Sequence, residues 1–598
     1  MEIINFQEIL KTVREIKKGN TKNFKEIKIA FLRNYTTEKI IPYLEFFLLK
    51  DGFKPTFYFS AFDNIFQDTL DEKSDYYKFS PDITIIAMTT LLISEKLVYR
   101  FAETPQDNSF NEIERITSDI ESLIVNLTKN KVGTILVNNF ETPDFASMGI
   151  LDYQNSNYQI NSFRKINLKL AKICEKYSEV NVVDVDFLQR LLGTKITKDY
   201  RLWHIEKNPY SQKFLHYLAF DYIKFIRAIK GKVKKCLVLD LDDTLWGGTI
   251  GEDGIKGIKL GNTFPGSSFM NFQKSILNLY NRGVILAICS KNNIEDVIEV
   301  LKKHPDMILK KDNFAIIKAN WTDKASNIKE ISDELNINLD SLVFIDNNPF
   351  EINLVKKELP QVQCIQLSND PTSYSHMIDS LGIFDNLNFS TEDLNRTKMY
   401  KVEAKRKISR KNYTNLDSYL SSLEMKVEIF KNDSFCTPRI AQLSQRTNQF
   451  NLTTKRYSEA EISSYTKDSN TDVLAIRLED KFGDMGIIGS SIIKYTANEA
   501  NIDTFLLSCR SLGRGVEDIF LNLCLEIIKK RGYNDIKSEY YKTEKNKQVE
   551  NFFDTRGFKL IENNNNIEKK YISDKSDKSL KKLSKNFNII GYGEKIGG

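Results

Sequence analysis

The stretch from Cys236 to Gly254, CLVLDLDDTLWGGTIGEDG, constrains the fold of this chain most strongly. It begins with four apolar residues and continues with Asp240 and Asp242. A short apolar run bounded by polar residues and glycines is typical of a buried parallel strand. Because side chains alternate along an extended chain, both carboxylates are expected on the same side. They would then lie at the end of a strand, where open α/β sheets bind ligands.

Two neighbouring carboxylates repel each other unless a cation or a proton lies between them. The pair Asp240 and Asp242 therefore predicts a Mg²⁺ site with a nucleophile and a general acid. From this stretch alone, an Asp-rich turn formed for purely local reasons remains the alternative.

Composition limits the class of protein. The chain has 598 residues, of which 41% are apolar, so several domains with real cores are expected. No apolar run approaches a membrane span, and the first residues do not resemble a secretory signal. Seven cysteines without a CxxC pair indicate a reduced, cytoplasmic protein. A net charge of +6 on this size does not indicate nucleic-acid binding, and the four histidines have no zinc-site spacing.

The chain before residue 231 alternates apolar runs with helical patterns, which indicates a parallel sheet covered by helices. Strands are expected at 26–35, 54–60, 81–88, 133–138 and 180–185. Asn138, Asn139 and Asp184 fall at or near strand ends, but roles in turns are the favoured interpretation. No Ser nucleophile follows the first strand, where Arg33-Asn34-Tyr35 stands instead.

Three further strand ends after residue 254 carry polar residues. Ser290 follows an apolar strand, Lys324 opens a helix after the next strand, and Asp346 follows a third. Each has a plain alternative as a helix cap, an exposed lysine or a turn residue. Together with Asp240 and Asp242, however, they form the set that a phosphoryl-transfer site requires.

The same order of residues resembles the haloacid-dehalogenase (HAD) superfamily of phosphatases. The segments Asp240-Leu-Asp-Asp-Thr-Leu-Trp-Gly-Gly248, Cys289-Ser-Lys-Asn292, Asn320-Trp-x-x-Lys324 and Phe344-Ile-Asp-x-Asn-Pro349 look like its FkbH-type subclass (HAD-IIIC). The resemblance implies a multidomain α/β protein. Its expected parts are an SGNH-hydrolase-like, non-catalytic α/β domain (1–230), a Rossmann-like HAD domain (231–385), a basic helical linker (386–423), a GNAT-like α+β domain (424–575) and a mobile tail (576–598).

The resemblance also implies residue roles. Asp240 would attack phosphate and bind Mg²⁺, and Asp242 would act as general acid and base with its backbone carbonyl on the metal. Thr244 would support the loop, and the phosphate oxygens would be held by Ser290 and Lys324. Asp346 and Asn347 would complete the metal shell. Asn347 departs from the Asp common in the family, although its amide oxygen can still coordinate.

FkbH-type enzymes are expected to load a glyceryl unit from 1,3-bisphosphoglycerate onto an acyl carrier protein as a thioester, with loss of phosphate. Cys289 is the candidate acyl-carrying thiol, because neighbouring lysines can lower a thiol pKa. Its alternative is a buried strand residue, and alternation places Cys289 and Ser290 on opposite sides if the strand continues through both. The gaps from Gly254 to Ser268 and from Ser290 to Lys324 leave no room for a large cap domain.

Two further segments bear on the carrier protein. The linker contains eight basic residues: Arg396, Lys398, Lys401, Lys405, Arg406, Lys407, Arg410 and Lys411. A solvated helix is the favoured interpretation, with docking of an acidic carrier as the alternative. In the last domain, Arg510-x-x-Gly513-Arg514-Gly515 resembles the pyrophosphate loop of GCN5-related acetyltransferases. A strand–loop–helix unit offers backbone N–H groups to an anion, so the segment is expected to bind the carrier's phosphopantetheine; a simple glycine turn is the alternative.

The sequence therefore predicts a cytoplasmic enzyme that uses Mg²⁺, a phosphorylated three-carbon substrate and a carrier protein. Two alternatives remain open. One is a small-molecule phosphatase in surface-glycan or secondary metabolism, and the other is a non-catalytic scaffold that binds carrier proteins.

Overall fold

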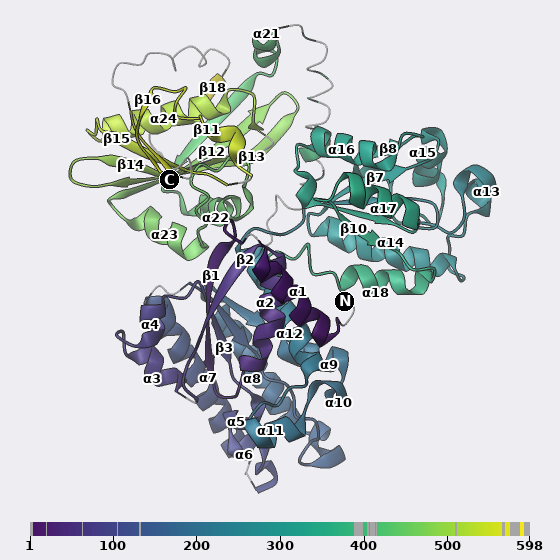
Figure 1. Ribbon diagram of the computed structural model, residues 1–598, viewed down its shortest axis with the longest axis vertical. Helices are drawn as coiled ribbons and strands as arrows, with labels where there is room; N and C mark the ends of the chain where they lie inside the picture. Colours follow the sequence, from purple (N-terminus) through teal and green to yellow (C-terminus); the bar gives the residue numbers. More distant parts are fainter. Residues whose placement is uncertain are drawn as a thin grey trace. The chain divides into compact units, whose positions relative to one another are not determined.

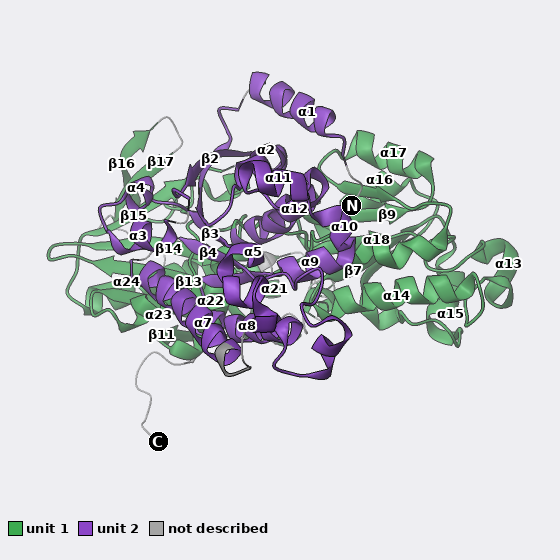
Figure 2. Ribbon diagram, turned by 90° about the horizontal axis from the view of Figure 1, so that it is seen from below, with its two compact units in different colours: residues 1, 230–598 green, residues 2–229 purple. Residues whose placement is uncertain are grey.

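The protein is described by a computed structural model (Figure 1). The structure describes residues 4–19, 21–62, 64–103, 106–130, 133–387, 397, 399–402, 406, 409, 413, 415–508, 511–543, 545–564, 568–573 and 587–590. The chain divides into two compact units, residues 2–229 and residues 230–598 with residue 1, which Figure 2 colours separately. Among the described residues, every helix is too short or too polar to cross a membrane.

The unit 2–229 contains a five-stranded parallel sheet in the order β2-β1-β3-β4-β5. Its strands are β1 Lys25–Arg33, β2 Phe53–Phe59, β3 Ile83–Ala87, β4 Thr134–Asn138 and β5 Val180–Val183. Its helices are α1 Phe6–Lys18, α2 Ile41–Lys50, α3 Ile65–Leu70, α4 Asp75–Phe79, α5 Thr90–Ile93, α6 Glu95–Val98, α7 Gln106–Lys129, α8 Gln159–Cys174, α9 Val185–Leu192, α10 Thr194–Thr197, α11 Tyr200–Glu206 and α12 Gln212–Ile229. The predicted parallel sheet with covering helices is confirmed, and β3 is buried along its whole length as the apolar run requires.

The unit 230–598 begins with a second parallel sheet in the order β10-β9-β6-β7-β8. Its strands are β6 Cys236–Leu239, β7 Ile285–Ser290, β8 Phe314–Ala319, β9 Leu342–Asp346 and β10 Gln363–Gln366. Its helices are α13 Ile250–Gly257, α14 Gly266–Asn281, α15 Ile294–Lys303, α16 Lys324–Leu335, α17 Pro349–Glu358 and α18 Tyr374–Asp379. Leu237 and Leu239 join one core cluster and Cys236 and Val238 another, so β6 is covered on both faces. The strand at the centre of the sheet is therefore the one that the sequence singled out.

The rest of this unit is built on a mixed, eight-stranded sheet in the order β16-β17-β15-β14-β13-β12-β11-β18. Its strands are β11 Met425–Lys431, β12 Thr471–Asp480, β13 Gly483–Tyr495, β14 Ala500–Leu507, β15 Ile536–Tyr541, β16 Phe558–Asn564, β17 Glu568–Ser573 and β18 Phe587–Ile590. Its helices are α21 Leu416–Ser421, α22 Thr437–Arg446, α23 Glu459–Lys467 and α24 Val516–Lys530. The predicted mixture of α/β and α+β architecture is confirmed.

The structure differs from the predicted mobile tail in one place. Residues Phe587–Ile590 form β18, which pairs in parallel with β11 from Met425 to Glu428. The backbone of β18 pairs with a strand whose edge would otherwise be unpaired. The other residues of the predicted tail lie outside the described residues.

Candidate active site

Asp240, Lys324 and Asp346 meet at the carboxyl edge of the central parallel sheet. Asp240 follows β6, Asp346 ends the neighbouring β9, and Lys324 begins α16 directly after the β8 loop. The Lys324 ammonium lies 2.9 Å from Asp240 Oδ1 and 2.6 Å from Asp346 Oδ2. All three side chains are buried. The strand-end residues that the sequence grouped together are thus in contact.

Burial and like charge dominate the electrostatics of this group. Burial, and then the charge of Asp240, raise the pKa of Asp346 to about 6 although Lys324 opposes the shift. Burial alone would lower the pKa of Lys324, but Asp240 and Asp346 outweigh it and hold this pKa above its usual value. The lysine therefore stays charged, and the two carboxylates gain from any further cation placed between them.

The carboxylates of this group fit Mg²⁺ better than they fit a metal whose ligands are all protein side chains. Among the described residues, no group of three or more His, Cys, Asp or Glu side chains is arranged to hold a metal. Mg²⁺, however, is usually bound by one or two carboxylates and keeps several waters or substrate oxygens. Asp240 and Asp346 supply two buried carboxylates that face the same ammonium, and half-buried Asn347 follows directly. These residues fit a two-carboxylate Mg²⁺ site.

Asp242 points to a different set of partners. Its Oδ1 accepts hydrogen bonds from Trp246 Nε1 at 2.9 Å and from the Ile250 backbone N–H at 3.1 Å. Its Oδ2 accepts one from Asn292 Nδ2 at 3.0 Å. Burial is the largest influence and raises the pKa of Asp242, while these donors oppose the shift. The sequence predicted Asp242 as an acid and base but did not predict the donors that hold it.

Ser290 is linked to Asp242 through Asn292, and Thr244 lies in the loop that follows Asp242. Ser290 ends β7 and is buried, and its Oγ accepts a hydrogen bond from Asn292 Nδ2 at 3.1 Å. Thr244 is also buried, and its Oγ1 has no hydrogen-bond partner among the described residues. Asn292 therefore links the predicted phosphate-binding Ser290 to Asp242. The sequence indicated Asn292 only as the last residue of the segment Cys289-Ser-Lys-Asn292.

The structure supports the core alternative for Cys289. Its side chain has no exposed surface and belongs to the cluster that covers one face of β6. Its thiol donates to the Lys324 backbone carbonyl at 3.7 Å, and burial raises its pKa above the usual range. Because β7 continues through Ser290, alternation keeps Cys289 and Ser290 on opposite sides. A buried, protonated thiol does not suit an acyl carrier. Of the other cysteines within the described ranges, only Cys364 is more than marginally exposed.

The predicted anion-binding loop is described only in part. Arg510 lies outside the described residues. Gly513 and Gly515 have φ values of 75° and 79°, which glycine adopts readily, and Gly515 caps the 15-residue α24. Arg514 is buried, and its guanidinium lies 3.8 Å from Asp480 and donates to Met485 Sδ at 3.2 Å. The glycines suit a tight loop at a helix start, whereas Arg514 is directed into the protein.

Two cations of the basic linker are described, and both are bound within the chain. Arg406 makes two hydrogen bonds of 2.6 Å to Asp480, and this pair is almost fully buried. Lys401 contacts the Asp312 carboxylate at 3.2 Å. Arg406 is thus a structural residue and not part of a solvated helical face. Arg396, Lys398, Lys405, Lys407, Arg410 and Lys411 lie outside the described residues.

In the unit 2–229, the polar residues at strand ends bond to one another. Asn138 Nδ2 donates to the buried Tyr222 hydroxyl at 2.8 Å. Asn139 Nδ2 donates to Asp184 Oδ1 at 2.7 Å, and Asp184 also caps α9. These contacts support the turn and packing roles favoured from the sequence.

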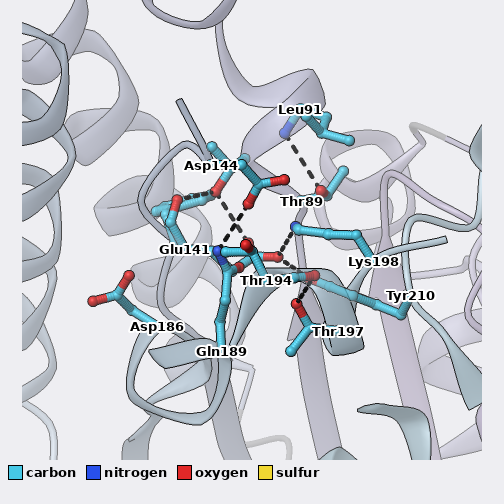
Figure 3. Close-up of polar contacts among 12 residues, drawn as sticks. Thr89, Leu91, Glu141, Asp144, Asp186, Gln189, Thr194, Thr197, Lys198 and Tyr210 are labelled. Carbon is cyan, nitrogen blue, oxygen red and sulfur yellow. Dashed lines mark hydrogen bonds and ion pairs between the residues drawn. The ribbon is translucent and has the colours of Figure 1, made fainter. Parts of the chain in front are cut away.

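The same edge holds a buried ion pair that the sequence did not reveal (Figure 3). Glu141 Oε1 lies 2.8 Å from Lys198 Nζ and accepts a hydrogen bond of 2.5 Å from the Tyr210 hydroxyl. Glu141 Oε2 accepts one from Thr90 Oγ1 at 3.0 Å. Burial alone would raise the pKa of Glu141, but Lys198 and Tyr210 outweigh it and lower this pKa. Every carboxylate oxygen is bonded internally, which favours a structural role.

Comparison with known families divides the chain at the same place as its fold. Residues 50–227 match the family described as FkbH, N-terminal domain, and residues 235–372 match the NLI interacting factor-like phosphatase family. Among curated proteins, none matches the chain at a significant level.

Among solved structures, the N-terminal part of BF1531 from Bacteroides fragilis, which contains a phosphatase domain complexed with Mg, is similar. It shares 29% identity, covers 65% of this chain and 100% of its own, and has a TM-score of 0.59. PaiA N-acetyltransferase from Thermoplasma acidophilum, solved with coenzyme A, shares 19% identity over 25% of this chain and 98% of its own, with a TM-score of 0.18. The ribosomal-protein-S18-alanine N-acetyltransferase of Escherichia coli shares 13% identity over 26% of this chain and 97% of its own, with a TM-score of 0.20.

Proposed function

We propose that this chain, which carries an FkbH N-terminal domain followed by an NLI interacting factor-like phosphatase domain, is a Mg²⁺-dependent phosphatase acting in acyl transfer. The observation that carries the proposal is the contact of Lys324 with both Asp240 and Asp346 at the ends of neighbouring strands. A buried nucleophile, a fixed cation and a second carboxylate are what phosphoryl transfer requires.

The residues divide the reaction between them. Asp240 attacks phosphorus, and Asp242 donates a proton to the leaving oxygen and later takes one from the hydrolytic water. Ser290 and Lys324 hold the phosphate oxygens. Asp240, Asp346, Asn347 and the Asp242 backbone carbonyl would bind Mg²⁺, which when bound neutralises phosphate charge. The similar BF1531 structure contains Mg, which supports this assignment.

The finer proposal concerns the substrate. We expect 1,3-bisphosphoglycerate as donor and the phosphopantetheine thiol of an acyl carrier protein as acceptor. The thiol sulfur attacks the acyl carbon, the bond from that carbon to the phosphate oxygen breaks, phosphate leaves and the thiol proton passes to solvent. Asp240 then removes the remaining ester phosphate. The scheme needs no enzyme thiol, in agreement with the burial of Cys289.

The loop before α24 is proposed to hold the carrier arm. Backbone N–H groups at a helix N-terminus attract phosphate, and the phosphopantetheine arm carries one. Gly513 and Gly515 allow the chain to turn closely there.

Intact mass spectrometry of a holo-carrier protein after reaction tests the proposal. A glyceryl-sized increment supports it, and Asp240→Asn should leave the heavier phosphoglyceryl increment on the carrier instead. Free phosphate without carrier modification would instead indicate a small-molecule phosphatase. Neither product, with carrier binding retained, would indicate a scaffold. A carrier variant lacking the phosphopantetheine serine provides the matched control.

A further inference from the structure

Trp246 lies inside the loop that returns to Asp242. Its side chain is fully buried, and residues 242 and 246 form a bridge pair within this loop. Gly248 has a φ of 90°, and a Cβ added at Gly247 would lie 2.8 Å from the Phe269 ring. The two glycines following Trp246 therefore let the chain fold tightly enough to bring its indole N–H onto Asp242.

The two oxygens of Asp242 are bonded unequally. Among the described residues, Oδ1 accepts from both Trp246 Nε1 and the Ile250 N–H, whereas Oδ2 accepts only from Asn292 Nδ2. A carboxylate oxygen offers about two lone-pair positions. Oδ1 is therefore filled by N–H donors, and Oδ2 keeps one position for a proton.

We propose that Trp246 is a positioning residue that anchors Oδ1 of Asp242 and thereby makes Oδ2 the oxygen that carries the catalytic proton. The inference rests on the proposed function, in which Asp242 is the general acid. As the phosphorus–oxygen bond of the substrate breaks, the proton on Oδ2 moves to the leaving oxygen. Asp242 becomes a carboxylate that the three N–H donors already hold, so no reorganisation is needed.

The dependence on the leaving group distinguishes this role from a purely structural one. An alkyl phosphate has a poor leaving group and needs the acid, whereas an acyl phosphate leaves without protonation. Trp246→Phe keeps an aromatic ring but removes the N–H. It should lower kcat/KM for a primary alkyl phosphate by about 10²-fold, the lower range for acid catalysis, and leave acetyl phosphate nearly unaffected.

Trp321→Phe is the matched control. The Trp321 indole is exposed and donates to Asn293 Oδ1 at 3.2 Å, not to Asp242. This substitution should change both substrates by the same factor. In an Asp242→Asn background, Trp246→Phe should cause no further loss on the alkyl phosphate, because the two residues act as one unit.

An equal loss on both substrates, or a full further loss in the Asp242→Asn background, would overturn the inference. If Trp246→Phe does not fold, benzothienylalanine at position 246 keeps the bicyclic shape and lacks the N–H, and the same split is expected. Phosphate release from the primary alkyl phosphate that survives Asp240→Asn would instead refute the proposed function, so the two failures are distinguishable.

Discussion

Replacing Lys198 by Met should leave Glu141 as an unpaired buried carboxylate. The Lys198 ammonium lies 2.8 Å from Glu141 Oε1, and the two side chains are 7% and 1% exposed. Without the cation, Thr90 and Tyr210 are the side-chain donors that Glu141 retains within the described part of the chain. Breaking a buried pair in this way typically costs about 3–5 kcal/mol.

Protonation of Glu141 limits the loss. For a reference pKa of about 4.3, taking up a proton at pH 7 costs about 3.7 kcal/mol, at about 1.4 kcal/mol for each pH unit. We therefore expect Lys198→Met to lower the free energy of unfolding of residues 2–229 by about 3.5 kcal/mol at pH 7 and by about 1 kcal/mol at pH 5. In the wild type, stability instead falls as the pH decreases. Because its pKa is lowered in the folded protein, Glu141 stabilises above its unfolded pKa, and this contribution is lost as the pH falls.

Urea unfolding followed by tryptophan fluorescence measures this loss. The chain has three tryptophans, and with Trp246 and Trp321 replaced by Phe, Trp203 alone reports on residues 2–229. The double variant Glu141→Gln with Lys198→Met removes both charges and should lose much less stability than Lys198→Met alone. A loss below about 1 kcal/mol at pH 7, or one that does not change with pH, would show that the buried Glu141–Lys198 pair does not stabilise this unit.

Other variants probe other parts of the chain. His216 is buried with both ring nitrogens unpartnered among the described residues, and burial lowers its pKa to about 4. Below about pH 6.5 His216 therefore binds a proton in the unfolded chain but stays neutral in the folded protein. The free energy of unfolding should fall as the pH decreases from about 6.5 towards 4. His216→Phe should remove this effect and gain up to about 2 kcal/mol more at pH 5 than at pH 7 in the same fluorescence assay; equal gains would count against it. Cys289→Ala should retain both phosphate release and carrier acylation, and loss of acylation alone would restore Cys289 as acyl carrier. Asp480→Asn strands the buried Arg406 and should cost about 3–5 kcal/mol, seen as faster hydrogen exchange in β12, whereas unchanged protection would contradict the structural role of the pair.

The main features of the central domain are predictable because they are local in sequence. Short apolar runs ending in polar residues define β6, β7 and β9, and a parallel sheet necessarily brings their carboxyl ends to one edge. The contact of Asp240, Lys324 and Asp346 follows from that rule. Strand alternation also places Cys289 and Ser290 on opposite faces once β7 continues to Ser290, and both are buried because β7 is covered on both faces.

The features that were missed depend on contacts between residues distant in sequence or on backbone geometry. Glu141 and Lys198 are 57 residues apart and carry no local signal that they pair. Arg406 appears within a basic run, yet its partner Asp480 is 74 residues away. The Trp246 contact with Asp242 requires a turn whose shape depends on Gly247 and Phe269. From the sequence, such a residue cannot be told from an ordinary surface or core residue. Its role becomes visible only when the fold brings its partner into contact.

The most direct test of the phosphatase assignment is to trap the phosphorylated enzyme. The protein would be mixed with acetyl phosphate and Mg²⁺, quenched with acid and digested, and its peptides would be mapped by mass spectrometry. We expect one phosphoryl group on Asp240 of the wild type, formed only with Mg²⁺. Asp240→Asn should lack this group and should release no phosphate. Undiminished phosphate release by Asp240→Asn, with no phosphorylated peptide in the wild type, would contradict it.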